Sequence, residues 1–220
     1  MSKSNKYGYV GVDIPAQSFG NNKGVFNPAE INELVADNKW TSFGQLELIE
    51  TQTVTSGTSV DFTNIKEDIY NVHFVTINNA DNDDSSGTPS LYFRYYESGV
   101  LETASVYQFA RQVGRDNASF AESRSTSLNA LPLSLGIGTS GGANSKSGGY
   151  QYIYNAGDSS KYTFSTHHNY ATETTNGSGF SFGSGVLPQT STVNGLSFTW
   201  LGGQSWVSGT ISLYGIKEYS

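Results

Sequence analysis

Two stretches decide the fold, residues 45–52 (QLELIETQ) and residues 59–65 (SVDFTNI), because apolar and polar side chains alternate in both. In the first of them Leu46 and Leu48 stand on either side of Glu47. Successive side chains of a β-strand point to opposite faces, so a period of two lets one face of each segment be buried. Each stretch therefore predicts a β-strand with one buried face.

The same alternation continues through the rest of the chain. Runs of Asn, Asp, Ser and Gly separate the alternating segments, as expected of turns. The further strands expected from this pattern are Ile69–Asn78, Leu91–Tyr96, Ser105–Arg111, Tyr150–Asn155, Tyr162–His168, Gly179–Leu187, Leu196–Leu201 and Thr210–Ile216. Many short strands joined by turns predict an all-β fold, an antiparallel, jelly-roll-like β-sandwich over residues 44–220.

Residues 1–43 have a different pattern, which predicts an extended arm with one short helix over about residues 28–38. Asn27 is a good N-cap, and Pro28 occupies the first helical position. A helix of about three turns is too short to be stable alone in water, so it is expected to dock on a partner. The apolar side chains expected to carry this docking are Phe26, Ile31, Leu34, Val35 and Trp40.

Composition and charge exclude several classes of protein. The chain has 220 residues with no Cys, which excludes disulfide frameworks and thiolate metal sites. Lys and Arg number 12 against 19 Asp and Glu, giving a net charge of −7, and the basic residues are scattered, which argues against nucleic-acid binding. The sequence shows no apolar segment expected to serve as a signal peptide or a membrane span.

A stretch without charges, residues 174–216, has two interpretations. A partner or a neighbouring copy could cover it, because interface cores are depleted in charge. Under that interpretation the candidate oligomer interface comprises Phe180, Phe182, Trp200 and Trp206. Under the other interpretation the stretch forms central strands whose outer faces carry Ser and Thr.

Glycine-rich strings resemble cofactor and hydrolase motifs only superficially. Residues 136–141 spell G-x-G-x-x-G after a strand-like segment, but no helix pattern follows to bind a pyrophosphate. Residues 138–142 and 179–183 spell G-x-S-x-G, and the first string is followed by Asp158 and by His167 or His168. A nucleophile elbow requires a strand-to-helix turn, which neither string predicts. No cofactor is therefore expected, and no catalytic residue is assigned.

Two candidate metal sites are weak. His167 and His168 would point to opposite faces of a strand and so could not chelate one ion together, and a solvated pair is expected instead. The loop containing Asp81, Asp83 and Asp84 offers oxygen ligands for Ca²⁺, but it departs from the EF-hand pattern. A hydrated turn is the simpler interpretation.

Exposed aromatic residues and carboxylates raise two further candidate functions, sugar binding and glycoside hydrolysis. Tyr150, Tyr152 and Tyr154 share one strand face, which favours core or cross-strand packing over a sugar-binding platform. Loops 80–90 and 139–149 are the segments expected to contact glycans in an adhesin. The carboxylates available to a hydrolase are Glu97, Glu102, Glu122 and Asp158, but nothing in the sequence pairs them.

Several motifs resemble those of a group of phage proteins. They are residues 7–11, 17–19, 24–30 and 39–40 near the start, 44–50 and 70–74 at the first strands, and 182–188 and 208–216 near the end. In these motifs the chain resembles small virion structural proteins, of the tail-fibre-like and head-decoration type, from tailed phages of marine bacteria, especially cyanobacterial phages. The resemblance covers both ends and most of the chain.

The resemblance implies a non-enzymatic virion structural protein, synthesised in the cytoplasm of the bacterial host. Residues 1–43 would dock to other virion proteins, and residues 44–220 would project as a fibre, knob or appendage that can contact the host surface. A homo-oligomer is expected, with a trimer favoured. The alternatives are a capsid decoration or adaptor protein, and a carbohydrate-binding adhesin that contacts host surface glycans.

Overall fold

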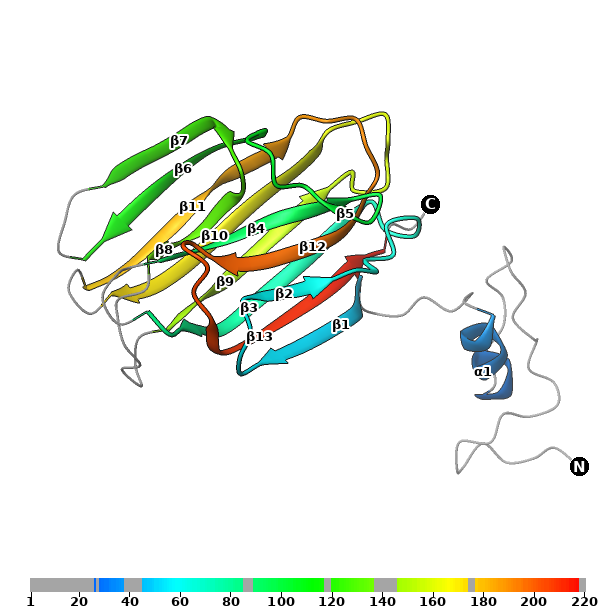
Figure 1. Ribbon diagram of the computed structural model, residues 1–220. Helices are drawn as coiled ribbons and strands as arrows, with labels where there is room; N and C mark the ends of the chain where they lie inside the picture. Colours follow the sequence, from blue (N-terminus) through cyan, green and yellow to red (C-terminus); the bar gives the residue numbers. More distant parts are fainter. Residues whose placement is uncertain are drawn as a thin grey trace, which may run out of the picture. The chain divides into compact units, whose positions relative to one another are not determined.

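The structure is a computed structural model that describes residues 26, 28–37, 45–84, 89–116, 120–136, 146–173 and 177–217. The chain divides into two units, Met1–Gly44 and Gln45–Ser220. The first contains helix α1, and the second contains the strands β1 to β13 (Figure 1). Among the described residues, no helix is long and apolar enough to cross a membrane.

Helix α1 spans Pro28–Ala36 and begins at the proline that the sequence places first. Its apolar stripe is not buried: Ile31 and Leu34 are half-buried, and Val35 is 54% exposed. Phe26, just before the helix, is also half-buried. Trp40, the remaining candidate docking residue, lies outside the described residues.

Two antiparallel sheets make up the second unit, which confirms the all-β sandwich (Figure 1). The larger sheet has the order β1 (Leu46–Val54), β13 (Trp206–Ile216), β3 (Val72–Asn82), β9 (Ser147–Tyr154), β10 (Thr163–Glu173), β11 (Gly177–Leu187), β6 (Tyr107–Arg115) and β7 (Ala121–Leu128). The smaller has the order β2 (Ser59–Phe62), β12 (Val193–Trp200), β4 (Ser90–Glu97) and β5 (Val100–Leu101), and β8 (Leu131–Gly136) also pairs with β4.

The core lies where the alternating apolar faces of the two sheets meet. Val75 and Ile77 face inward from β3, and Phe198 faces inward from β12. The Phe198 ring packs against Phe62 and Phe93, with ring centroids 6.1 Å and 6.2 Å apart. These rings form one buried cluster with Val75 and Ile77 of the larger sheet, and burying one such side chain stabilises the fold by about 1.5–3 kcal/mol. The cluster therefore holds the two sheets together.

Trp200 and Trp206 belong to this core. They are 2% and 1% exposed, and their ring centroids lie 5.1 Å apart. Because both indoles are enclosed within the protomer, they cannot form the oligomer interface suggested for them. The predicted interface is therefore wrong for Trp200 and Trp206. The other two candidate residues, Phe180 and Phe182, lie on the outer face of the larger sheet.

The stretch without charges forms β11, β12 and β13. Each of these strands is hydrogen-bonded to a neighbour on both sides. β11 lies between β10 and β6, β12 between β2 and β4, and β13 between β1 and β3. Central strands need no charges to prevent pairing with other chains. The interpretation as central strands is therefore sufficient for most of this stretch.

Charges do mark the two edge strands of the larger sheet. β1 carries Glu47 and Glu50, and β7 carries Glu122 and Arg124. β7 was not expected from the sequence, because its residues AESRSTSL give no apolar alternation. Its exposed position at the sheet edge explains this pattern, since neither face of β7 is buried.

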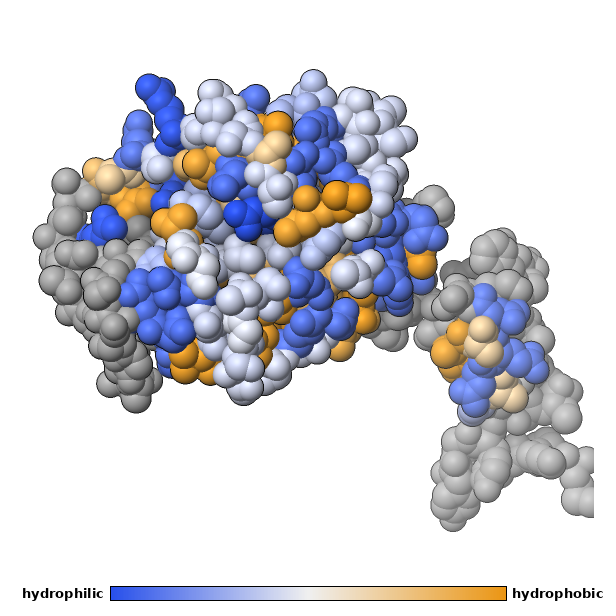
Figure 2. All heavy atoms as spheres, in the orientation of Figure 1, coloured by the Kyte–Doolittle hydropathy of each residue, from blue (hydrophilic) through white to orange (hydrophobic). Residues whose placement is uncertain are grey.

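The outer face of the smaller sheet is polar and internally hydrogen-bonded. From β4, Arg94 Nε donates to the Asn129 carbonyl oxygen at 2.8 Å, and Arg94 Nη1 donates to Thr199 Oγ1 at 3.2 Å. The Tyr96 hydroxyl donates to Asp61 Oδ1 at 3.1 Å. β12 and β4 lie in front in Figure 1, and the same view in Figure 2 shows mostly hydrophilic and intermediate residues there.

Candidate functional site

The outer face of the larger sheet is built by the register of five neighbouring strands, β9, β10, β11, β6 and β7. Residues paired across antiparallel strands share one face, so the register produces rows of side chains perpendicular to the strands. One outward row is Tyr150, His168, Phe182, Gln112 and Glu122, and the next is Tyr152, Thr166, Ser184, Ala110 and Arg124.

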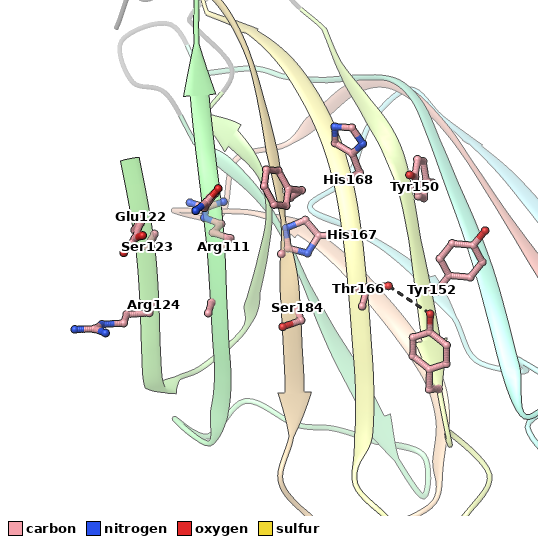
Figure 3. A pocket seen from close by; sticks show the side chains of 15 residues that line it. Arg111, Glu122, Ser123, Arg124, Tyr150, Tyr152, Thr166, His167, His168 and Ser184 are labelled. Atoms are coloured by element: carbon pink, nitrogen blue, oxygen red, sulfur yellow. Dashed lines mark hydrogen bonds between the residues drawn. The ribbon is translucent and has the colours of Figure 1, made fainter. Parts of the chain in front are cut away.

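The second row has small side chains at its centre. Thr166, Ser184 and Ala110 come from three adjacent strands and lie between the large side chains of Tyr152 and Arg124. They leave a groove of about 850 Å³ on the surface. Figure 3 shows the tyrosines on one side of this groove and β7 on the other, with Thr166 and Ser184 between them. A second hollow of about 380 Å³ adjoins the first beyond Tyr154.

An aromatic wall borders the groove along β9. Tyr152 packs on Phe74 of β3 with centroids 4.8 Å apart, and Tyr150 lies 5.9 Å from the same ring. Tyr154 stacks on Tyr152 at 6.3 Å. The expected cross-strand packing is confirmed, but these tyrosines are not in the core, and Tyr150 is 41% exposed. Their rings are therefore ordered by their neighbours while remaining accessible to a ligand.

Several polar side chains on the floor and far wall of the groove make no hydrogen bond within the described part of the chain. Among the described residues, nothing hydrogen-bonds to the side chains of Gln112, Glu122, Arg124 or Ser184. The Tyr154 hydroxyl lies 3.5 Å from Thr166 Oγ1. Amide, hydroxyl, carboxylate and guanidinium groups together can both donate and accept hydrogen bonds. The groove thus offers unused hydrogen-bonding groups opposite an aromatic wall.

The two adjacent histidines point to opposite faces of β10, as the alternation predicts. His168 lies on the outer face, where its ring contacts Tyr150 and Phe182 at 5.9 Å and 6.3 Å. His167 faces the interior and is 6% exposed. Burial, followed by the charges of Arg111 and His168, lowers the pKa of His167 to about 4. The expectation of a solvated pair is wrong for His167.

The hydrolase-like and dinucleotide-like strings form no catalytic site in the described residues. Ser181, the serine of the second G-x-S-x-G string, is fully buried within β11, where no strand-to-helix turn exposes it. The first string, residues 138–142, and most of the G-x-G-x-x-G string lie outside the described residues. Of the loops 80–90 and 139–149, which are expected to contact glycans, residues 85–88 and 139–145 are also outside them.

The acidic loop does not gather its carboxylates. Asp81 is buried, and its Oδ2 lies 2.5 Å from Lys146 Nζ, while its Oδ1 accepts from the backbone of Asn82 at 3.0 Å. Asp83 Oδ1 accepts from the Ser205 N–H at 2.8 Å. Within the described part of the chain, no group of three His, Cys, Asp or Glu side chains could hold a metal ion. Asp81 therefore serves a structural ion pair.

The structure brings together one pair of carboxylates that the sequence leaves apart, Glu97 and Glu102. Burial, partly offset by a hydrogen bond from Ser191, raises the pKa of Glu97, and the adjoining Glu102 raises it further. The two side chains are near enough to hydrogen-bond to each other, which is closer than the separation of about 5–9.5 Å between the carboxyl groups of a glycosidase. Asp158 instead pairs with Lys161 at 2.7 Å, which lowers its pKa to about 2.

The sequence did not reveal the groove, because Thr166, Ser184 and Ala110 lie on strands that are far apart along the chain. No protein-family model, curated protein or solved structure matches this chain. The geometry and chemistry of the groove therefore carry the functional argument.

Proposed function

We propose that this chain is a non-enzymatic phage virion protein whose β-sandwich binds a host surface glycan in the groove over β9, β10, β11, β6 and β7. The observation that carries the proposal is the combination of an accessible aromatic wall with unpartnered hydrogen-bonding groups on the opposite side. Small-molecule sites are typically concave, with aromatic side chains and a few placed polar groups, and occupy about 300–1,000 Å³.

The chemistry of the groove suits a sugar. Tyrosine rings present an apolar face to the C–H groups of a pyranose, while their hydroxyls remain hydrated. Gln112, Ser184 and Thr166 offer donors and acceptors to sugar hydroxyls. A second copy of the chain would fit less well, because protein interfaces require close packing and the centre of this surface is hollow.

Size and charge narrow the class of glycan. Four inter-strand spacings of about 4.8 Å separate β9 from β7, so the groove spans about 19 Å. That span suits an oligosaccharide better than a single sugar. On the outer face Glu122 and Arg124 carry opposite charges on the same strand. The proposed ligand is therefore a neutral oligosaccharide.

Binding without hydrolysis is the activity that the groove supports. Glu122 is the one carboxylate among the described residues that line it. Hydrolysis of a glycosidic bond usually requires two carboxylates on opposite sides of that bond.

The assignment to a virion rests on the sequence resemblance, with residues 1–43 as the docking segment. Helix α1 supports this assignment, because none of its residues is fully buried and Val35 is 54% exposed. Substituting both Ile31→Asp and Leu34→Asp is expected to prevent incorporation into particles. Normal incorporation of the double variant would refute the docking role. A trimer remains a proposal, which light scattering after gel filtration would check.

Replacing Tyr152 with Ala tests the glycan site. The loss of an anchoring aromatic side chain is expected to weaken glycan binding about tenfold or more. Binding of the full chain would be found on an array of neutral oligosaccharides and measured by calorimetry. Tyr96→Ala is the matched control, because Tyr96 lies on the outer face of the smaller sheet.

Two results would overturn the proposal. One is the absence of binding to any glycan at high protein concentration. The other is equal weakening by the two tyrosine variants, which would indicate a general effect on folding. If the mass of the chain instead corresponds to an oligomer that dissociates on Tyr152→Ala, the groove is an interface between copies.

A further inference from the structure

Beneath the groove, the inner face of β6 carries two arginines, Arg111 and Arg115. They lie four residues apart on the same face of the strand, and both are half-buried. Arg111 reaches the smaller sheet, where its Nη1 donates to the carbonyl oxygen of Ser134 at 2.8 Å. Ser123 of β7 is its cross-strand neighbour on this inner face.

In the described part of the chain, no carboxylate balances the guanidinium of Arg111. A guanidinium has five N–H donors, but within the described residues Arg111 makes this one hydrogen bond, and its Nε is buried without an acceptor. The charges that act on it are those of Tyr92 and Arg115, with no carboxylate among them. A partly buried cation beside a like charge is unfavourable unless an anion accompanies it.

A second buried group faces the same region. His167 projects from β10 to the inner face, and its Nε2 has no hydrogen-bond partner in the described structure. Arg111 is close enough to disfavour the imidazolium, and burial and this charge lower the pKa of His167. Near neutral pH His167 is therefore uncharged and does not add to the charge of Arg111, which no carboxylate of the described residues balances.

We propose that Arg111, with its cross-strand neighbour Ser123, binds an oxyanion of the sulfate or phosphate type at this edge of the sandwich. The planar fork of a guanidinium matches two oxygens of such an anion, which would accept the unused N–H groups. Because Arg111 is half-buried, the ion can reach it from solvent. By the strand register the side chains of Arg111 and Ser123 point to the inner face of the sheet, although both residues also border the groove. The proposed anion site uses these inward side chains and does not depend on the proposed glycan binding.

Histidine NMR on the full chain tests this site. Sodium sulfate is expected to shift the His167 ring signal saturably and to raise its measured pKa, whereas chloride at equal ionic strength should not. His168, on the other face of β10, is the internal control. The signals would be assigned with H167Q and H168Q variants. This comparison uses the wild-type chain and so does not depend on a variant folding.

Three arginine variants locate the bound ion. Arg111→Gln should weaken sulfate binding about tenfold or more, because charged hydrogen bonds are lost. Arg124→Gln removes the same charge from an exposed position on the outer face and should have no such effect. Arg111→Lys keeps the charge but loses the fork, so intermediate affinity is expected.

The source of the anion is distinguished by a parallel titration with an O-sulfated disaccharide. Tighter binding of the ester, lost in Arg111→Gln, would indicate an anionic group carried on a larger molecule. Tighter binding of free sulfate would indicate an inorganic ion. Failure of both to shift His167, an equal shift with chloride, or unchanged binding in Arg111→Gln would each overturn the proposal.

Discussion

The two outer faces of the sandwich use their polar side chains differently. On the smaller sheet, Arg94, Tyr96 and Asp61 are bonded within the protein. On the larger sheet, four polar side chains at the groove have no hydrogen-bond partner among the described residues, and they stand opposite exposed aromatic rings. Polar groups bonded to each other stabilise the fold, whereas polar groups left free in a concave surface are available to a ligand.

Both faces depend on one core, and the largest expected effect comes from breaking it. Trp206→Ala removes a side chain that is 1% exposed and packs on Trp200. Large-to-small changes of this kind destabilise by about 3–5 kcal/mol. Chemical denaturation should show this loss of unfolding free energy in a single transition. Two separate transitions within residues 45–217 would contradict the view that the faces share one core.

Filling the groove should strongly weaken glycan binding, whereas a matched change on the smaller sheet should not. Ser184 is exposed at the centre of the floor, so Ser184→Tyr is expected to leave the fold intact and block the ligand. We expect a loss of glycan affinity of about a hundredfold, equivalent to about 2.7 kcal/mol, measured by calorimetry. Thr199→Tyr, on a central strand of the smaller sheet, is the control and should bind normally. Equal binding by both variants would place the ligand elsewhere.

The strands could be predicted because a buried face imposes alternation on each sequence segment by itself. β1 and β2 show it clearly, and β7 does not, since neither of its faces is buried. Trp200 and Trp206 were misjudged for a related reason. An uncharged strand can be central in a sheet or covered by a partner, and the sequence shows only that charge is missing.

The candidate site could not be predicted, because it depends on register. Tyr150, Tyr152 and Tyr154 share a face by alternation alone, but the sequence does not show which face is covered by the other sheet. The groove also requires Ala110 of β6 to align with Ser184 of β11 and Thr166 of β10. A shift of one residue in either pairing would turn every side chain of a strand to the other face.

The buried His167 beneath the groove predicts a pH dependence of the unfolding free energy that the outer face of the smaller sheet does not share. The folded pKa of His167, about 4, lies below its usual value of 6.5, so the unfolded chain binds a proton that the folded chain excludes. Its contribution to stability is complete above pH 6.5 and is lost as the pH falls towards 4. We expect about 2 kcal/mol of unfolding free energy to be lost by pH 5. In His167→Gln, denaturation between pH 7 and 5 should lack this component, and His168→Gln should retain it.

The smallest expected effect comes from comparing one arginine on each outer face, Arg94 on the smaller sheet and Arg124 on the larger sheet. Arg94→Ala removes two hydrogen bonds, to Asn129 and Thr199, and should lower the unfolding free energy by about 1–2 kcal/mol. Arg124→Ala removes a side chain that is exposed and has no partner in the described structure, so the change should stay within about 0.5 kcal/mol.

Glycan affinity should show the reverse order in the same two variants. Arg124 lines the groove and Arg94 does not, so only Arg124→Ala should weaken binding. Denaturation and calorimetry on both variants therefore give four values. Arg94→Ala should lower stability and not glycan affinity, and Arg124→Ala should lower glycan affinity and not stability. A variant that loses both stability and binding would show that its arginine couples the two properties. The division between a structural polar face and a binding face would then be wrong at that position.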